Sequence, residues 1–322
     1  MSLASVFLAT GSYLPKKQLS NDDLAKIVET NDAWIRERTG ITNRHIAAEG
    51  EFTSHMAIEA CKAALANAGL EGSAIDGIVI GTSTPDSSMP STATRVQAAL
   101  GSKGPAVDVS AACAGFVYAL SVAHGWLQAG ISKRVLVIGA ESMSKIIDWN
   151  DRNTCVLFGD GAGAVILEAQ PIAQAEGRGI KHITLDAAGE FGDLLGTDGG
   201  VASTKTAGHL FMQGQEVFRH GVDKMGAAGV ATVEKAGLTL AQVDWIVPHQ
   251  ANARMIKMIA RQLRLPEEKF IITVDRHANT SAASIPLALD VANREGKLRK
   301  GNIIAMPALG AGLTWGCCVT SW

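Results

Sequence analysis

An excess of charge of either sign is missing from this sequence. Its 322 residues carry 29 Lys and Arg against 31 Asp and Glu, which gives a formal net charge of −2. Such a balance produces no overall field that would attract nucleic acid or an anionic membrane, so a charged partner must be recognised by a local patch. We therefore expect no nucleic-acid partner.

Long hydrophobic runs and targeting signals are also lacking. No stretch approaches the roughly 20 apolar residues that a membrane-spanning helix needs. The first residues, MSLASVFLATGSYLP, have no basic segment, and their apolar run ends at Gly-Ser and Pro, which predicts a first strand rather than a signal peptide. We expect a cytoplasmic protein with no membrane partner.

Cysteines are few and are not spaced for metal binding. The five are odd in number, which favours reduced thiols, and we expect no metal site. The adjacent pair Cys317 and Cys318 is predicted to pack in a strand rather than to do redox chemistry. What the sequence does have is 47% hydrophobic residues and 34 glycines, the composition of a globular protein with a large core.

An internal repeat divides the chain. AGLEGSAIDGIV at 68–79 matches AGLTLAQVDWIV at 236–247, an offset of 168 residues, and both copies predict a helix that stops at glycine and a strand that follows. RVLVIG at 134–139 recurs as NIIAMP at the same offset. Buried strands alternating with helices predict an α/β protein with two similar halves related by a pseudo-twofold axis. We place these halves at 1–170 and 171–322.

A lone cysteine follows the strand predicted at 104–109. AACAGFVYALSVAHGWLQAG at 111–130 has no proline and ends at glycine, which predicts a helix with Cys113 in its first turn. There the free amides and the helix dipole favour an anion, so we expect the pKa of the thiol to fall and the reactive thiolate to form. From this stretch alone a buried structural cysteine is an equal alternative, because the small neighbours are also good packing residues.

The second half supplies two candidate partners for this cysteine. The position 168 residues after Cys113 is 281, where DRHANTSAASIPLAL places Asn279 just before another helix start. If a twofold axis relates the halves, the two helix N-termini face each other and bring Asn279 near Cys113. In DWIVPHQAN (244–252) a strand ends and His249 follows, at the edge where α/β sheets place their chemistry. A thiol, an imidazole and a carboxamide can then converge, although each taken singly also has a purely structural interpretation.

Together these motifs resemble β-ketoacyl-[acyl-carrier-protein] synthase III, the initiating condensing enzyme of type II fatty-acid synthesis. The resemblance rests on CAGFVYAL around Cys113, VPHQAN around His249, DRHANTSAAS around Asn279, the FGDGAGA run and the C-terminal GAGLTWG. It extends from GSYLP near the N-terminus to the last residues. It implies a thiolase-like α/β fold of two duplicated βαβαβαββ halves, layered αβαβα, in a homodimer.

The resemblance also implies a two-stage acyltransferase mechanism. An acyl group moves from a short acyl-CoA, in the simplest case acetyl-CoA, to Cys113; malonyl-[acyl-carrier protein] then loses carbon dioxide and attacks the acyl-cysteine to give the 3-oxoacyl product. His249 and Asn279 would donate hydrogen bonds to the malonyl thioester oxygen. The amides of Cys113 and Ala311 would form a second oxyanion hole. Acyl-CoA is a substrate, and no metal or redox cofactor is implied.

Binding residues follow from the same resemblance. Trp34 and Arg152 would clamp the CoA adenine, with Arg38 available for a CoA phosphate. Asn252 would line the pantetheine tunnel.

The resemblance also assigns a basic helix to binding of the carrier protein and a methionine to the acyl pocket of the dimer partner. Arg254 and Arg261 lie on the charged face of the helix predicted at 253–265 and would bind the acidic carrier protein, although a solvated face is the default interpretation of such charges. Met89 in DSSMPSTA would close the acyl pocket of the dimer partner, and a flexible methionine predicts a short-chain primer.

Two residues depart from the family pattern. Ala311 stands in a loop where some members have three glycines, and its amide can serve if its φ is negative. Ala278 stands where many relatives have glycine, which concerns the geometry of that loop.

Three alternatives stay open. A degradative thiolase would need a second catalytic cysteine in the C-terminal glycine-rich loop, where PALGAG has none before Cys317. Specialised condensing relatives that make polyketides, quinolone precursors or methylglutaryl-CoA share the three site residues and differ in primer or acceptor. A non-enzymatic acyl-CoA-binding or carrier-binding protein would have no need to keep Cys113, His249 and Asn279 together.

Overall fold

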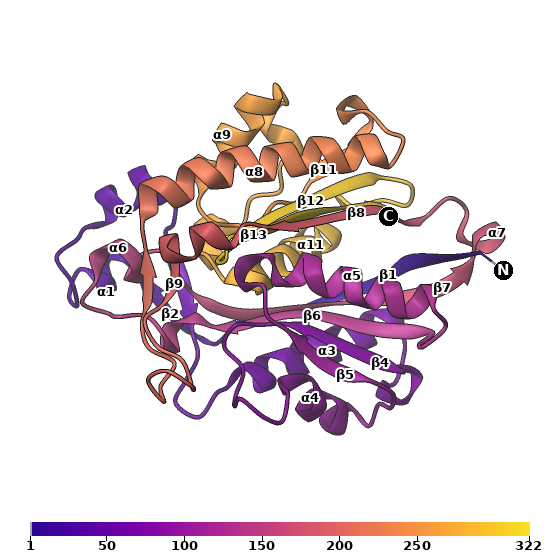
Figure 1. Ribbon diagram of the computed structural model, residues 1–322, viewed down its shortest axis with the longest axis horizontal. Helices are drawn as coiled ribbons and strands as arrows, with labels where there is room; N and C mark the ends of the chain where they lie inside the picture. The colour runs from indigo at the N-terminus through magenta and orange to yellow at the C-terminus, as the bar shows by residue number, and fades with distance from the viewer. Residues whose placement is uncertain (1) are drawn as a thin grey trace.

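The structure is a computed structural model that describes residues 2–322, and two β-sheets form its centre (Figure 1). The first sheet has the strand order β1-β7-β6-β4-β5 and the second the order β11-β12-β13-β8. The strands of the first are β1 (Leu3–Tyr13), β4 (Gly77–Gly81), β5 (Ala106–Val109), β6 (Arg134–Ser142) and β7 (Asp160–Pro171). Those of the second are β8 (Gly179–Ala187), β11 (Trp245–Ile246), β12 (Ile303–Gly310) and β13 (Thr314–Ser321).

The two sheets repeat one topology. Strands β1, β7, β6 and β4 have their counterparts in β8, β13, β12 and β11, with the same pattern of parallel and antiparallel neighbours. A bridge between Ile246 and Phe270 stands where β5 lies in the first sheet. The repeat expected from the sequence therefore exists in space, and the fold is α/β.

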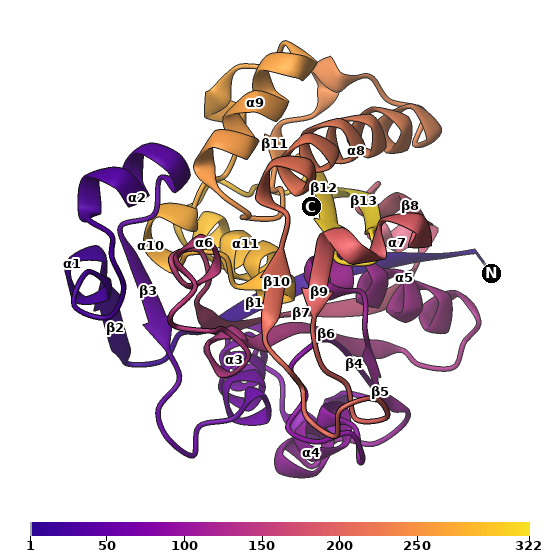
Figure 2. The ribbon, with the colours of Figure 1, turned by 60° about the vertical axis from the view of Figure 1, so that its left-hand side comes forward.

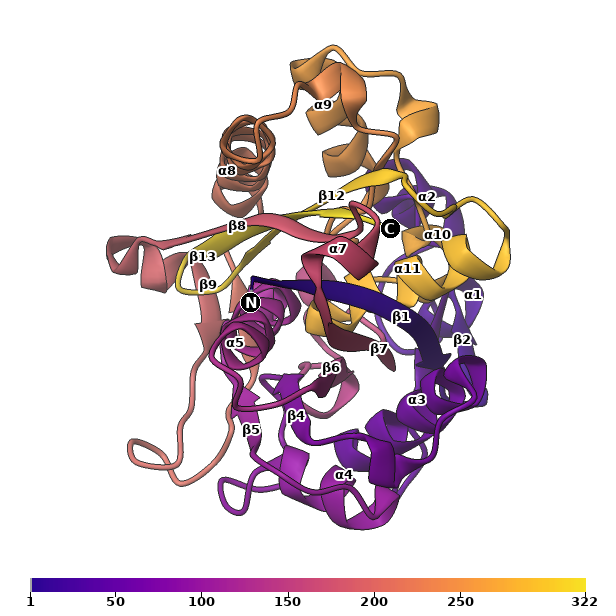
Figure 3. The same cartoon turned by 90° about the vertical axis from the view of Figure 1, so that its right-hand side faces the viewer.

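Helices cover both sheets and separate them (Figure 3). The outer face of the first sheet carries α3 (Thr53–Ala68) and α4 (Thr92–Leu100), and the second sheet is covered by α8 (Gly214–Lys235) and α9 (Ala253–Leu263). Between the sheets lie α5 (Gly115–Gln128) and α11 (Ser284–Arg294). The layers are therefore αβαβα, as predicted. No helix within residues 2–322 has the length and apolar character needed to cross a membrane.

Shorter elements surround these layers (Figure 2). They are β2 (Lys17–Ser20), α1 (Asn21–Leu24), α2 (Asp32–Thr39), β3 (Asn43–Ile46), α6 (Arg152–Cys155), α7 (Ile172–Ala175), β9 (Leu195–Thr197), β10 (Leu210–Met212) and α10 (Val274–His277). Short 3-10 turns are η1 (Gly72–Ala74), η2 (Ala112–Ala114), η3 (Met143–Lys145), η4 (Gly189–Leu194), η5 (Leu240–Gln242), η6 (Glu267–Lys269) and η7 (Ser281–Ala283).

Burial on both faces explains why the central strands are continuous apolar runs in the sequence. Residues 135–142 of β6 are all buried, because helices lie on both faces of its sheet. Phe116 and Leu120 of α5 pack with Leu289 of α11 in the layer between the sheets. Cys317 and Cys318 are buried free thiols on opposite faces of β13, which confirms that they are packing residues.

The helix predicted at 111–130 begins later than expected. Cys113 lies in η2, and α5 starts only at Gly115. The second half repeats this arrangement with η7 followed by α11, displaced by 169 residues instead of 168. The counterpart of Cys113 is therefore Ala282, and the prediction of position 281 was wrong by one residue.

Candidate active site

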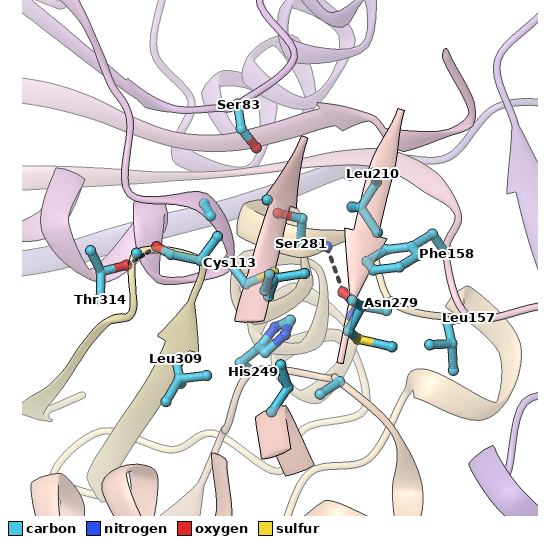
Figure 4. Close-up of a pocket in the computed structure, with 18 of the residues that line it drawn as sticks. Ser83, Cys113, Leu157, Phe158, Leu210, His249, Asn279, Ser281, Leu309 and Thr314 are labelled. Carbon is cyan, nitrogen blue, oxygen red and sulfur yellow. Dashed lines mark hydrogen bonds between the residues drawn. The ribbon is translucent and has the colours of Figure 1, made fainter. Parts of the chain in front are cut away.

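Cys113, His249 and Asn279 line one cavity of about 600 Å³ between the two halves (Figure 4). Cys113 comes from η2, His249 follows β11, and Asn279 precedes η7. Their exposed fractions are 8%, 3% and 6%. The structure thus brings together the three residues that the sequence proposed, and all three are buried in the wall of this cavity.

A left-handed residue directs the cysteine into the cavity. Ala112 has φ +45°, and Cys113 follows it in the 3-10 turn. The turn between β12 and β13 lies directly against this segment, since a Cβ added to Gly310 would be 2.6 Å from the Cys113 amide nitrogen. Cys113 is therefore held by close backbone packing from the second half.

The Ala311 backbone lies in this same turn. The Thr314 hydroxyl lies 3.0 Å from the Ala111 carbonyl oxygen and 3.1 Å from the Ala311 carbonyl oxygen. Its single hydrogen is shared between the two, which ties the turn to the segment before Cys113. Ala311 is not among the residues of positive φ. The condition for its amide to serve in an oxyanion hole is therefore met.

The pKa of Cys113 shifts in the direction opposite to our expectation. Burial raises it to about 12, and the charge of the buried Glu141 acts in the same direction, while the Ser281 hydroxyl and the cysteine's own amide act in the opposite direction. The helix dipole was expected to lower the pKa, but α5 begins two residues later and the thiol is almost fully removed from water. At rest the site therefore holds a protonated thiol.

His249 is a neutral imidazole with an assigned tautomer. Its backbone amide donates to the Pro307 carbonyl at 2.9 Å, and its Nδ1 lies 2.8 Å from Ser284 Oγ. Ser284 Oγ accepts a hydrogen bond from the Gln250 amide at 3.3 Å, and we assign its own hydrogen to Nδ1, which places the imidazole proton on Nε2. Burial lowers the pKa of His249 to about 3. The imidazole is therefore a hydrogen-bond donor through Nε2.

The Asn279 carboxamide is held by the backbone that follows it. The Ser281 amide donates to Asn279 Oδ1 at 2.8 Å, which leaves Nδ2 as the donor on the cavity side. The Asn279 amide donates to the Leu157 carbonyl at 2.9 Å. Ala278 has φ +59°, a value that favours glycine, so the departure from the family pattern is accommodated in a strained backbone.

Outside the cavity lining, the guanidinium groups of Arg38 and Arg152 both lie over the Trp34 ring. The Cζ atoms of Arg38 and Arg152 each lie 4.6 Å from the centre of its ring. An adenine between Trp34 and Arg152 would need two stacked layers of about 3.5–4 Å each. The structure brings the predicted clamp residues together, and Arg152 must move outward before an adenine can enter.

Asn252 joins the cavity to the basic helix. It lines the cavity and caps α9, with its Oδ1 accepting from the Met255 amide at 2.8 Å. Arg254 and Arg261 are exposed on α9, as the amphipathic pattern predicted. Helix α2 packs directly against the start of α9, since a Cβ on Gly40 would be 2.5 Å from the Cβ of Ala253.

Met89 lies away from the cavity of its own chain. Its side chain is 81% exposed, on the loop that follows β4, and it is absent from the cavity lining formed by residues 2–322. Helix α4 follows this loop, and the next strand, β5, is the edge strand of the first sheet.

Sequence reasoning missed the residues that shape and support the site. Apolar side chains from distant segments line the cavity, among them Phe158, Leu195, Leu210, Met212 and Phe218. Ser284 and Ser281, which hold His249 and Asn279, were also missed. Both belong to the quoted DRHANTSAAS run, but nothing in a run of small polar residues tells which hydroxyl faces an imidazole.

Comparison with known proteins agrees with this architecture. Family models described as 3-oxoacyl-[acyl-carrier-protein] synthase III and its C-terminal part match residues 107–189 and 233–322. The chain is 52% identical to a β-ketoacyl-[acyl-carrier-protein] synthase III of Bradyrhizobium sp., covering 100% of both chains, and 53% identical to one of Paracoccus denitrificans, covering 99% of both.

Solved structures give the same result. The crystal structure of 3-oxoacyl-[acyl-carrier-protein] synthase III from Aquifex aeolicus matches with a TM-score of 0.93 and 44% identity, covering 99% of this chain and 100% of that one. A priming β-ketosynthase of a polyketide pathway matches with a TM-score of 0.92 and 33% identity, covering 99% and 97%. The chain belongs to the β-ketoacyl-[acyl-carrier-protein] synthase III family.

Proposed function

We propose that this protein condenses a short acyl-CoA with malonyl-[acyl-carrier protein], releasing carbon dioxide and CoA and initiating fatty-acid synthesis. The observation that carries the proposal is the convergence of a buried thiol, a neutral imidazole and an oriented carboxamide in one cavity. A protein that only binds acyl-CoA or the carrier protein has no use for that combination. The reaction needs no metal or redox cofactor, because decarboxylation supplies the carbanion equivalent.

Cys113 is the nucleophile of the first stage. Its sulfur attacks the acyl-CoA carbonyl carbon, the bond from that carbon to the CoA sulfur breaks, and the thiol proton leaves with CoA. The amides of Cys113 and Ala311 stabilise the oxygen anion of the tetrahedral intermediate, since the Ala311 turn is pinned beside Cys113 by Thr314. Covalent catalysis divides one difficult carbon–carbon bond formation into two easier steps.

His249 and Asn279 act in the second stage. As carbon dioxide leaves the malonyl group, negative charge develops on the thioester oxygen, and His249 Nε2 and Asn279 Nδ2 donate to it. A buried donor aimed at such a charge contributes about 3–4 kcal/mol. The enolate carbon then attacks the acyl-cysteine carbonyl and releases the thiolate of Cys113.

We assign the binding of both thioester substrates to residues of α2, α6 and α9. Trp34, Arg38 and Arg152 bind the CoA nucleotide, and Asn252 contacts the pantetheine arm. Arg254 and Arg261 form no ion pair within residues 2–322, in contrast to Lys257, which lies 3.8 Å from Glu267. These free cations on α9, whose N-cap Asn252 lines the cavity, support docking of the acidic carrier protein. The five free cysteines fit a cytoplasmic setting.

We further propose a homodimer in which Met89 enters the partner's acyl cavity. Its 81% exposure and the free edge strand β5 in the same half support this arrangement, because a free strand edge is a ready pairing surface. A methionine at that place sets a short primer.

Intact-protein mass tests the reaction directly. Wild type is incubated with acetyl-CoA and then with malonyl-[acyl-carrier protein], beside Cys113→Ala and the matched control Cys61→Ala, which changes another buried thiol on α3. We expect an acetyl adduct on wild type and on Cys61→Ala, discharged by the malonyl donor, and none on Cys113→Ala. An adduct formed only with long acyl-CoA would overturn the short-primer assignment, and no adduct with any acyl-CoA would overturn the reaction.

A further inference from the structure

One buried acid in the cavity region has no part in the proposed reaction. Glu141 lies on β6 with 0% exposure, and none of the ion pairs within residues 2–322 includes it. Burying a carboxylate without a cation is costly unless hydrogen bonds replace its water. Burial accordingly raises the pKa of Glu141, and its hydrogen bonds oppose that shift.

Those hydrogen bonds come from both halves of the molecule. From the segment after β4, Thr84 Oγ1 donates at 2.6 Å, and Ser83 donates from Oγ at 2.9 Å and from its amide at 3.2 Å. Thr82 Oγ1 lies at 3.3 Å. From the second half, Ser281 Oγ donates to Glu141 Oε1 at 3.0 Å. All these groups donate, which suits a carboxylate that can only accept.

Ser281 connects Glu141 to the site. Its amide makes the 2.8 Å hydrogen bond to Asn279 Oδ1 that leaves Nδ2 on the cavity side (Figure 4). Ser281 has φ +50°, a conformation that strains a residue other than glycine and persists only where the surroundings enforce it. The hydrogen bond from its hydroxyl to Glu141 is one contact that enforces it.

We propose that Glu141 is a positioning residue, which binds Ser281 Oγ and so fixes the turn whose amide orients Asn279 toward the enolate oxygen. The inference rests on the proposed function, because it assigns Glu141 to the decarboxylating stage. Ser83, which also binds Glu141, lines the same cavity. Glu141 thus sets the position of the Asn279 turn relative to the first half, which carries Cys113.

A second buried acid offers a matched control. Asp290 on α11 is 2% exposed and accepts hydrogen bonds from Thr10 Oγ1 at 2.8 Å and Ser12 Oγ at 2.5 Å; unlike Glu141, it also pairs with a cation, Arg294 Nε at 3.0 Å. These residues are not among those that line the cavity within residues 2–322. Asp290→Asn therefore repeats the chemical change of Glu141→Gln at a place that supports the fold only.

The experiment measures the two stages separately in single turnovers. Acylation of Cys113 by acetyl-CoA is followed by intact mass, and condensation is followed by mixing pre-acylated enzyme with malonyl-[acyl-carrier protein]. For Glu141→Gln we expect acylation within about threefold of wild type and condensation slower by about 10²-fold, as for the loss of an oriented oxyanion donor. Asp290→Asn should retain both rates.

Equal loss of both stages in Glu141→Gln, or condensation at the wild-type rate, would overturn the proposal. If Glu141→Gln does not fold, Ser281→Ala tests the same hydrogen bond between Glu141 and Ser281, because it leaves the other four donors to Glu141 in place. We expect condensation from the acyl-enzyme of Ser281→Ala to be about tenfold slower. An unchanged rate would overturn the inference. Failure of wild type itself to acylate or to condense would instead refute the proposed function.

Discussion

Replacing Gly310 by alanine should disable Cys113 without touching any side chain of the site. A Cβ at this position would lie 2.6 Å from the Cys113 amide nitrogen, 2.8 Å from the Ala111 carbonyl oxygen and 2.9 Å from the Ala114 amide nitrogen. An ordinary contact begins at 3.4 Å, so the backbone that carries the nucleophile must move by about 0.8 Å. All three atoms belong to the backbone, so rotation of a side chain cannot relieve the clash.

The magnitude follows from that displacement. Misplacing a reacting group by about 1 Å costs roughly 10²-fold in rate. Overpacking in a closely packed region costs about 1–3 kcal/mol of unfolding free energy. We therefore expect acylation of Gly310→Ala by acetyl-CoA to be slower by about 10²-fold, with unfolding by urea at a lower midpoint.

The matched control lies in the helix that follows the nucleophile. Gly125 in α5 has no atom within 4 Å of the position that an added Cβ would take, and a glycine in a helix costs about 0.5–1 kcal/mol relative to alanine. Gly125→Ala should therefore raise the free energy of unfolding and leave acylation unchanged. Acylation by Gly310→Ala within about threefold of wild type would refute the reasoning.

Three further results are expected. Trp34→Ala should raise the KM for acetyl-CoA about tenfold and leave kcat unchanged, because stacking with guanidinium groups contributes up to about 2 kcal/mol at a step that precedes the chemistry; an unchanged KM would exclude the clamp. Burial lowers the pKa of His249 to about 3, so its cation forms only near and below that pH. The pH–rate profile of single-turnover condensation from the acyl-enzyme should therefore show no fall in rate near pH 6.5. A fall there would mean that His249 titrates as an ordinary imidazole. Ser284→Ala removes the hydrogen bond to His249 Nδ1 and should slow condensation about tenfold, as expected for about 1.4 kcal/mol, while acylation persists; equal slowing of both stages would contradict this role.

The repeat made much of this architecture predictable. Two halves with one offset require equivalent strands and helices, and a twofold axis between them brings the segment before α11 to the segment before α5. That reasoning placed Asn279 beside Cys113 although the two are far apart in the sequence. The shared cavity follows from the symmetry of the halves, not from a local motif.

What the sequence could not provide depends on three-dimensional packing. The start of α5 is displaced by the left-handed residue Ala112, and alanine gives no local signal for that conformation. The pKa of Cys113 depends on how much water the second half excludes, which a helix-dipole argument does not include. The Glu141 network joins residues 57–140 positions apart, so no spacing rule predicts it.

The same burial that raises the pKa of Cys113 suits the proposed decarboxylation. In a site with little water, a malonyl carboxylate loses solvation that its product, neutral carbon dioxide, does not need, so desolvation favours the products. The remaining charge moves to the enolate oxygen, where neutral His249 and Asn279 donate hydrogen bonds that are stronger in a dry environment. At this stage Cys113 carries the acyl group as a neutral thioester, so its sulfur adds no anion to the cavity into which the malonyl carboxylate must enter.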